Sequence, residues 1–293
     1  MISILIPAKN EAKGLSTILP EIRSLYEEAE IIVVDDASTD DTKITSEKFG
    51  AKVISHPYSK GNGAAIKSGL RAARGKIIIC MDADGQHLPR DIEKLLQKMD
   101  DGFDMVVAAR NRVGQANLHR SLANRFYNHF ASWMVGHKVE DLTSGFRAVR
   151  TNKFREFLTL LPNKFSYPTT ITMSFFRAGY SIGYIPVEVK PRLAGTQSHI
   201  QLWQDGLRFL LIIFKIGTLF SPLKLFFPIS LSFFATAFIY YSYTFFEMGR
   251  FTNMSALLFT TSVVVFLMGL ISEQITSLIY KDTDSSDKNS TDE

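Results

Sequence analysis

The chain has 293 residues, enough for one sizeable domain with further elements, and its apolar content is ordinary for a globular protein. Its net charge of +4 suits an anionic membrane face or an anionic substrate, and we expect no nucleic acid partner. The single cysteine, Cys80, excludes an internal disulfide, and we expect it to be a buried thiol in a reducing compartment.

Residues 1–196 alternate short β-rich runs with helical patterns. The predicted strands cover 2–7, 30–36, 51–55, 76–82 and 104–110. The predicted helices cover 11–28, 40–49, 62–74 and 89–100. Nearly continuous apolar strands separated by helices are typical of an α/β fold with a mostly parallel sheet and helices on both faces. Ligands bind at the carboxyl ends of such strands, where this chain repeatedly places polar clusters.

The first two predicted strands each end in polar residues. In "PAKNE", Pro7 stops strand pairing and Asn10 is expected to cap the following helix. In "VVDDASTD", the residues Ser38 and Asp40 fit helix capping alone. Capping explains the pair Asp35 and Asp36 less well, and we expect the carboxylate of Asp36 to accept hydrogen bonds from a nucleoside base or ribose, with capping chemistry as the alternative.

The stretch "KGNGAAIKSG" contains Gly61-x-Gly63, the beginning of a dinucleotide-binding pattern. Ile66 stands where that pattern needs its third glycine, and the stretch does not follow the first strand. The phosphate-loop ending G-K-[ST] is also absent. We therefore predict a tight turn that leads into a helix, in which Lys60 could still meet a phosphate.

The stretch "MDADGQH" follows an apolar strand with two carboxylates, which repel each other unless a positive charge lies between them. A calcium loop is excluded because His87 stands where a glycine is required, and a glycosidase pair is excluded because the two carboxylates lie too close together. We expect Asp82, Asp84 and the Gln86 carbonyl to provide part of the shell of Mg²⁺ or Mn²⁺, and substrate phosphates to provide more. A solvated polar turn is the alternative.

Two later segments are polar and contain glycine. In residues 141–150, Asp141 is a candidate acceptor-side carboxylate and Arg147 offers a guanidinium fork for a phosphate, with a capped turn as the alternative. In residues 190–200, Arg192 and His199 could close over a diphosphate as a lid, with a flexible linker as the alternative.

Two uncharged apolar runs, 225–246 and 251–272, are long enough to cross about 30 Å of hydrocarbon, which needs roughly 20 residues. Their short linker predicts a transmembrane hairpin over 223–281, with a buried helix pair as the alternative. Lysines flank its open end, which predicts cytoplasmic termini and a cytoplasmic catalytic domain. We expect amphipathic interface helices over 197–222 and a disordered polar tail over 282–293.

The stretches "IPAKNE", "VVDDASTD", "MDADGQH" and "TSGFRAVR", in this order and before a hairpin, resemble the family 2 glycosyltransferases. Among these, the chain is most similar to the polyprenol-phosphate glycosyltransferases. The resemblance implies a GT-A nucleotide-sugar-binding fold over 1–196. It also implies an inverting, metal-dependent transfer from a UDP- or GDP-linked sugar to a polyprenyl phosphate at the cytoplasmic membrane face, by an enzyme that could form a homo-oligomer.

The resemblance implies roles for individual residues, each by its position in these motifs. Donor contacts are expected from Pro7, Lys9, Glu11, Asp36 and Ala83. Metal contacts are expected from Asp82, Asp84 and Gln86. Arg110 would face the donor or the acceptor phosphate, and Arg192 would belong to the closing loop. The acceptor side would be lined by Arg120, Asp141, Ser144 and Arg147. Catalytic roles would fall to Asp84, Arg110, Asp141 and Arg147.

The chain departs from the family pattern in three places. Lys9 stands where an aromatic residue is common, His199 follows the loop serine in place of a lysine, and residues 166–170 lack the usual acid. These departures bear on base stacking, on the closing loop and on sugar recognition.

The expected acceptor has a chemical consequence. A lipid phosphate is already an anion at neutral pH and needs no general base, unlike a sugar hydroxyl. We therefore expect cationic side chains around the nucleophile, from Arg110, Arg120, Arg125 and Arg147. Two other functions stay open: extension of a saccharide acceptor, and a non-catalytic scaffold that binds a sugar nucleotide.

Overall fold

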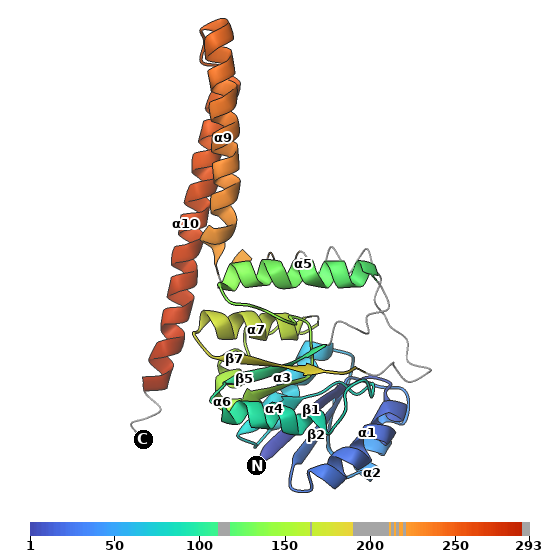
Figure 1. Cartoon of the computed structure of the whole chain (residues 1–293). Helices are drawn as coiled ribbons and strands as arrows, with labels where there is room; N and C mark the ends of the chain where they lie inside the picture. Colours follow the sequence, from blue (N-terminus) through green and yellow to red (C-terminus); the bar gives the residue numbers. More distant parts are fainter. Residues whose placement is uncertain are drawn as a thin grey trace. The chain divides into compact units, whose positions relative to one another are not determined.

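The computed structural model describes residues 1–110, 118–164, 166–189, 211, 214, 217–218 and 221–288. The chain divides into two compact units, Met1–Phe209 and Leu210–Glu293. The first unit contains a twisted sheet with helices packed on it, and the second contains two long helices (Figure 1).

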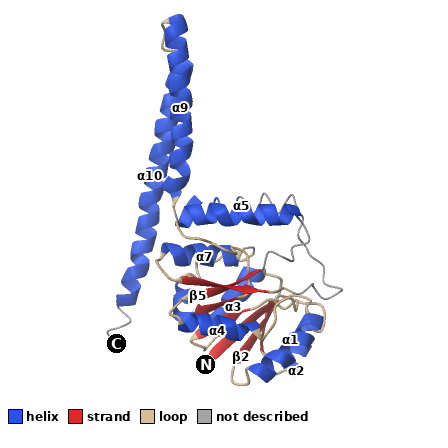
Figure 2. Ribbon diagram, in the orientation of Figure 1, coloured by secondary structure: helices blue, strands red, loops and turns tan. Residues whose placement is uncertain are grey.

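Within the described residues, the first unit forms a seven-stranded sheet in the order β3-β2-β1-β4-β6-β5-β7. Figure 2 shows the strands in red with helices around them. Its strands are β1 Ile2–Ala8, β2 Glu30–Asp35, β3 Lys52–Ser55, β4 Ile77–Cys80, β5 Met105–Arg110, β6 Arg147–Arg150 and β7 Ile182–Val187. Strands β3, β2, β1 and β4 pair in parallel, and β5 pairs in parallel with β7. Strand β6 lies antiparallel between β4 and β5, which makes the sheet mixed rather than wholly parallel.

All five predicted strands are present, each within two residues of its predicted limits. Strands β6 and β7 were not predicted. Strand β6 has only four residues, Arg147–Arg150, too few for a period of two to stand out. Strand β7 contains Pro186, which weakens a strand pattern in the sequence and which an edge strand tolerates.

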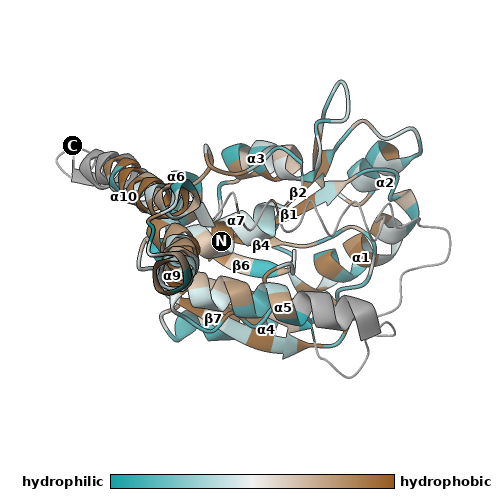
Figure 3. Ribbon diagram, turned by 90° about the horizontal axis from the view of Figure 1, so that it is seen from above, coloured by the Kyte–Doolittle hydropathy of each residue, from teal (hydrophilic) through white to brown (hydrophobic). Residues whose placement is uncertain are grey.

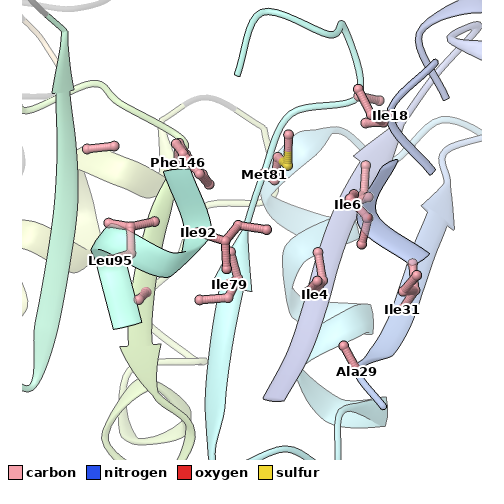
Figure 4. Packing of buried hydrophobic residues seen from close by; sticks show 14 of the residues in the cluster. Ile4, Ile6, Ile18, Ala29, Ile31, Ile79, Met81, Ile92, Leu95 and Phe146 are labelled. Atoms are coloured by element: carbon pink, nitrogen blue, oxygen red, sulfur yellow. The ribbon is translucent and has the colours of Figure 1, made fainter. Parts of the chain in front are cut away.

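Helices follow most strands and cover both faces of the sheet. They are α1 Ala12–Leu25, α2 Thr42–Lys48, α3 Asn62–Ala72, α4 Asp91–Asp100, α5 Leu118–Val135, α6 Thr151–Glu156 and α7 Tyr167–Arg177. On one face, Ile18 of α1 and Leu95 of α4 pack in the same cluster as Ile4 and Ile79 of the strands (Figure 4). On the other face, α3 comes so close to β1 that a Cβ on Gly69 would lie 1.9 Å from Cδ1 of Leu5. Because both faces are buried, most residues of β1, β4 and β5 are apolar.

The second unit is a helical hairpin of α9 Pro222–Met248 and α10 Asn253–Lys288. The spans Pro222–Met248 and Asn253–Leu278 are long and apolar enough to cross a membrane, and hydrophobic residues run along both helices (Figure 3). Gly249 ends α9 in the left-handed conformation at φ 61°, which glycine adopts at little cost. Helix α10 continues to Lys288, so the prediction of a disordered tail over 282–293 is wrong for residues 282–288. A formed helix propagates at low cost into polar sequence. Most of the predicted interface segment 197–222 lies outside the described residues.

Small side chains lie between the two helices of the hairpin at intervals of seven residues. They are Ser230, Ala237 and Thr244 on α9 and Ser255, Ser262, Gly269 and Thr276 on α10, all buried. An interval of seven is two helical turns, so each set lies on one side of its helix. Ser230 donates to the backbone oxygen of Ser262 (2.9 Å), and Ser262 donates to that of Ser230 (3.0 Å). Close approach of the backbones thus holds the hairpin together.

This packing predicts a cross-link. In a Cys80→Ser background, Ser230→Cys with Ser262→Cys should form a disulfide under mild oxidation, because the two hydroxyl oxygens lie 3.2 Å apart. Adding Gly269→Ile should reduce the yield several-fold, since even a Cβ there would lie 2.8 Å from Cβ of Phe226.

Mass spectrometry of the detergent-purified chain measures the yield of the disulfide. The exposed pair Ser232→Cys and Thr260→Cys is the control, and equal yields from both pairs would contradict this packing.

Candidate functional site

A pocket of about 410 Å³ opens at the carboxyl ends of the central strands. Seven of the predicted site residues line it: Pro7, Lys9, Glu11, Asp36, Asp82, Ala83 and Asp84. Further lining residues were not predicted as site residues. Gly61, Thr143, Gly145, Ser166 and Tyr167 belong to stretches that the sequence had marked, whereas Ser59, Asn62 and Lys164 had no local signal. They come from loops far apart in the chain that the sheet order brings to one edge.

The strand order gives the pocket a direction. Strands β3, β2 and β1 place Ser59, Asp36 and Lys9 at one end. Strand β4 places Asp82 next, and the turn before β6 places Thr143 beyond it. A ligand with several chemically distinct parts can therefore lie along the edge of the sheet.

Asp36 is almost fully buried, and its carboxylate accepts four hydrogen bonds from the loop between β3 and α3. Oδ1 accepts from Nδ1 of His56 (2.7 Å) and the backbone N–H of Lys60 (2.8 Å). Oδ2 accepts from Oγ of Ser59 (2.7 Å) and the backbone N–H of Gly61 (2.8 Å). Burial acts to raise the pKa of Asp36, but these hydrogen bonds outweigh it and lower the pKa to about 2. Asp36 is therefore a permanent anion that holds the loop.

The glycines of "KGNGAAIKSG" have a packing role in this structure. A Cβ on Gly63 would lie 2.0 Å from the backbone oxygen of Pro162, and one on Gly61 would lie 2.8 Å from that of Asn163. The first amides of α3 are already bonded, since Gly63 donates to the Lys164 oxygen (3.2 Å) and Ala64 to the Asn163 oxygen (2.8 Å). This agrees with the predicted tight turn and leaves these amides unavailable to a phosphate.

The acidic loop, residues 81–87 after β4, is approached closely by the backbone on two sides, at Gly14 and at Gly145. Helix α1 lies so close to it that a Cβ on Gly14 would lie 2.1 Å from the backbone oxygen of Ala83. On the other side, a Cβ on Gly145 would lie 2.8 Å from Oδ2 of Asp82. Asp84 is 6% exposed and accepts a hydrogen bond from the backbone N–H of Gln86 (3.1 Å). A side chain at position 14 would therefore collide with the loop backbone, and one at position 145 would displace the Asp82 carboxylate.

His87, the last residue of "MDADGQH", lies behind the loop with its ring centroid 4.9 Å from that of Phe146. Its Nε2 is 3.9 Å from Oδ2 of Asp82. Burial lowers the pKa of His87 more than the carboxylates of Asp82 and Asp84 raise it. The ring is therefore neutral at pH 7 and supports the loop by packing.

The residues of the acidic loop fit a divalent cation that is shared with a ligand. Asp82 and Asp84 both line the pocket, and carboxylate oxygens are the ligands that Mg²⁺ and Mn²⁺ prefer. Within the described part of the chain, no group of three His, Cys, Asp or Glu side chains could hold a metal. Phosphate oxygens and water would have to complete the shell. Gln86, predicted as a further ligand, is not among the residues that line the pocket.

Arg110 and Asp141 form a bidentate ion pair beside the pocket. Nε and Nη2 of Arg110 donate to the two Asp141 oxygens at 2.8 and 2.9 Å, and Nη2 also contacts Oγ1 of Thr143. The same carboxylate accepts from the backbone amides of Thr143 and Ser144, both at 3.1 Å. Burial acts to raise the pKa of Asp141, but the hydrogen bond and the charge of Arg110 lower it overall. Asp141 is thus an ionised anchor for the turn before β6.

The position of Arg147 does not fit the predicted role, in which its guanidinium would bind a phosphate. Its side chain is fully buried in β6, and its guanidinium donates to the backbone oxygen of Pro168 (3.2 Å), to Oγ1 of Thr172 (3.1 Å) and to the backbone oxygen of Ser144. The side chain points into the packing between the sheet and α7, so it cannot reach a phosphate in the pocket. Ser144 is also buried and does not line the pocket.

Three predicted residues lie beyond what the structure describes. The side chain of Arg120 and the whole of Arg192 and His199 are outside the described residues. Their predicted roles stay predictions. Arg125 is exposed on α5 and does not line the pocket.

Two family models match the chain. Residues 3–158 match the model described as Glycosyl transferase family 2. Residues 221–278 match the model described as GtrB C-terminal hairpin. The two matches correspond to the pocket-bearing unit and the helical hairpin.

Curated relatives cover much of the chain. The glycosyltransferase AglJ of Haloferax volcanii is 25% identical over 290 residues, which is 94% of each chain. The polyprenol monophosphomannose synthase of Mycolicibacterium smegmatis is 27% identical over 66% of this chain and 78% of its own. Among solved structures, glucosyl-3-phosphoglycerate synthase from Mycobacterium tuberculosis in complex with Mn²⁺ and UDP-glucose has a TM-score of 0.56 at 23% identity, over 73% of this chain and 76% of its own. That likeness shows the GT-A fold.

Proposed function

Since the chain belongs to glycosyl transferase family 2, we propose that it transfers a sugar from a nucleoside diphosphate donor to a polyprenyl phosphate at a membrane surface. The observation that carries the proposal is the shared pocket. Asp82 and Asp84 lie in it together with Lys9 and Asp36, in a chain that also carries an apolar hairpin.

The donor end of the proposal is supported by the two acids of the loop. Asp82 and Asp84 would hold Mg²⁺ or Mn²⁺ against the donor diphosphate, in line with the structural relative that was solved in complex with Mn²⁺ and UDP-glucose. When bound, the cation would neutralise the charge that builds on the diphosphate as the glycosidic bond breaks. The nucleoside would then extend towards β2 and β3, and the sugar towards Thr143 and Gly145.

The acceptor end favours an anionic nucleophile. A phosphate oxygen would attack the anomeric carbon, and the nucleoside diphosphate would leave from the opposite face. Asp141 is committed to Arg110 and to the turn amides, so it is poorly placed to take a proton. An acceptor that is already ionised needs no such base. Arg110, whose side chain is 33% exposed, offers positive charge next to the pocket.

A lipid acceptor is supported by the hairpin and by α5. The hairpin matches a model of its own, and one relative is named as a polyprenol monophosphomannose synthase. Phe126, Phe130 and Trp133 follow one face of α5, with ring centroids 6.3 and 5.7 Å apart, and Trp133 is 45% exposed. Aromatic side chains of this kind suit the headgroup zone of a bilayer. Asn128 ties α5 to the turn that carries Asp141, through the Glu140 oxygen (2.7 Å) and the Leu142 amide (3.1 Å).

The proposal predicts the fate of a labelled sugar. The full chain in polyprenyl-phosphate vesicles, supplied with radiolabelled UDP- or GDP-sugars and Mn²⁺ or Mg²⁺, should move label into an organic-soluble, acid-labile lipid. Chelation with EDTA should remove the activity, because the two acids alone leave the diphosphate charge uncompensated. Vesicles without polyprenyl phosphate are the control. Label recovered in a water-soluble polymer, or in no product with any sugar nucleotide, would contradict the proposal.

A further inference from the structure

The carboxylate of Asp36 has no capacity left for a ligand. An ionised carboxylate offers about four lone-pair directions. In this structure, all four are used by donors from the loop 56–61: two side chains, of His56 and Ser59, and two backbone amides, of Lys60 and Gly61. The nucleoside contact predicted for Asp36 would require one of these hydrogen bonds to break, and breaking a hydrogen bond to a buried carboxylate costs free energy.

The same network extends to a lysine at the pocket wall. Ser59 gives its only proton to Asp36, so its oxygen can accept, and Nζ of Lys9 donates to it at 3.0 Å. On the far side, Nε2 of His56 lies 2.9 Å from Oγ of Ser68 in α3. The ammonium of Lys9 is thus held by a chain of hydrogen bonds that starts in the core.

Lys9 faces the pocket as a donor. A lysine ammonium has three N–H groups and no acceptor, and one of the three is used by Ser59. Lys9 and Ser59 both line the pocket at the end formed by β1 and β3, whereas Asp82 follows β4. If the diphosphate lies at Asp82 and Asp84, the group that reaches Lys9 is the nucleoside.

We propose that Lys9, positioned by Ser59 and Asp36, determines base specificity by donating a hydrogen bond to O4 of uracil or O6 of guanine. This inference rests on the proposed function and specifies its donor. Uracil and guanine carry ring carbonyl oxygens at positions where cytosine and adenine carry amino groups. An ammonium set against an amino group leaves two donors facing each other without an acceptor, which costs affinity. Asp36 is a positioning residue that fixes the loop and through it Lys9.

Calorimetry with UDP, GDP, CDP and ADP in Mn²⁺ tests this assignment on the full chain in detergent. The wild type should bind UDP or GDP about 10-fold or more tighter than ADP. Lys9→Met should weaken the binding of that preferred nucleotide by a similar factor and leave the affinity for ADP nearly unchanged. Ser59→Ala should weaken the binding of the same nucleotide by a smaller factor, because Lys9 keeps its charge but loses its hydrogen bond to Ser59. Lys9 is exposed, so Lys9→Met should fold.

Lys43→Met is the matched control, since it removes the same charge from the exposed face of α2 and should leave all four affinities unchanged. Equal weakening of all four nucleotides by Lys9→Met would mean a phosphate contact and would overturn the assignment. No weakening would overturn it as well. If the wild type bound no nucleoside diphosphate at all, the proposed function itself would fall, and the role of Lys9 with it.

Discussion

Asp84→Asn is expected to lower the rate of sugar transfer by about a thousandfold or more while the fold stays intact. Asparagine keeps the size of the side chain and can still accept from the Gln86 amide, so the loop should keep its shape. It removes the negative charge that would hold a divalent cation against the diphosphate. A cation that stabilises developing charge contributes several kcal/mol, and about 4 kcal/mol corresponds to a thousandfold in rate.

Two measurements distinguish a loss of cation binding from a loss of folded protein. Transfer rates over a Mn²⁺ titration, with electron paramagnetic resonance of bound Mn²⁺ in the presence of UDP, should show that Asp84→Asn loses both activity and ordered Mn²⁺. Thermal unfolding should change little. Asp101→Asn is the control, because this exposed acid pairs only with Lys98 (2.9 Å) in the described structure and lies away from the pocket. Near-normal transfer by Asp84→Asn would show that the pocket does not use this acid.

Gly14→Ala is expected to lower both stability and activity, which is the opposite of the usual effect of this change in a helix. Alanine normally stabilises a helix interior by about 1 kcal/mol relative to glycine. Here the added methyl group would lie 2.1 Å from the backbone oxygen of Ala83, far inside contact distance. Neither partner is the end of a flexible side chain, so α1 or the acidic loop must move. Such overpacking typically costs about 1–3 kcal/mol.

A shift of the loop should misplace Asp82 and Asp84 and cut transfer by about 100-fold, the loss expected for a 1 Å error in a reacting geometry. Denaturant unfolding of the unit Met1–Phe209 and the Mn²⁺ concentration for half-maximal rate are the two readouts. Ser16→Ala, on the exposed side of α1, is the control and should leave both unchanged. If Gly14→Ala were more stable than the wild type and fully active, the close contact between α1 and the loop would not exist in solution.

Local pattern accounts for much of the site. Each predicted motif follows a strand whose apolar run is visible in the sequence, and parallel strands bring their carboxyl ends to one edge. That is why the sequence pattern suffices to place Pro7, Asp36, Asp82 and Asp84 in one pocket. The hairpin could be predicted for the same kind of reason, because the length and polarity of a segment decide whether it can cross a bilayer.

Partners that lie far apart in the chain could not be predicted in this way. The sequence predicts that Asn10 caps α1, but Oδ1 of Asn10 accepts from the Thr39 amide (2.7 Å), and the first amide of α1, at Ala12, binds Asp40 (3.1 Å). Both contacts join two loops that leave neighbouring strands. A capping signal describes the residues next to a helix and does not register a competing acceptor brought in by the sheet.

The sequence alone determined which strand ends carry acids and which segments are apolar enough for a membrane, because both properties depend on near neighbours in the chain. Only the tertiary structure decided what those side chains face. It showed Arg147 buried under α7, Asp36 saturated by its own protein, and Lys9 held at the pocket wall. Hydrogen-bond capacity and burial depend on the whole surroundings of a group, and the sheet assembles those surroundings from residues many positions apart.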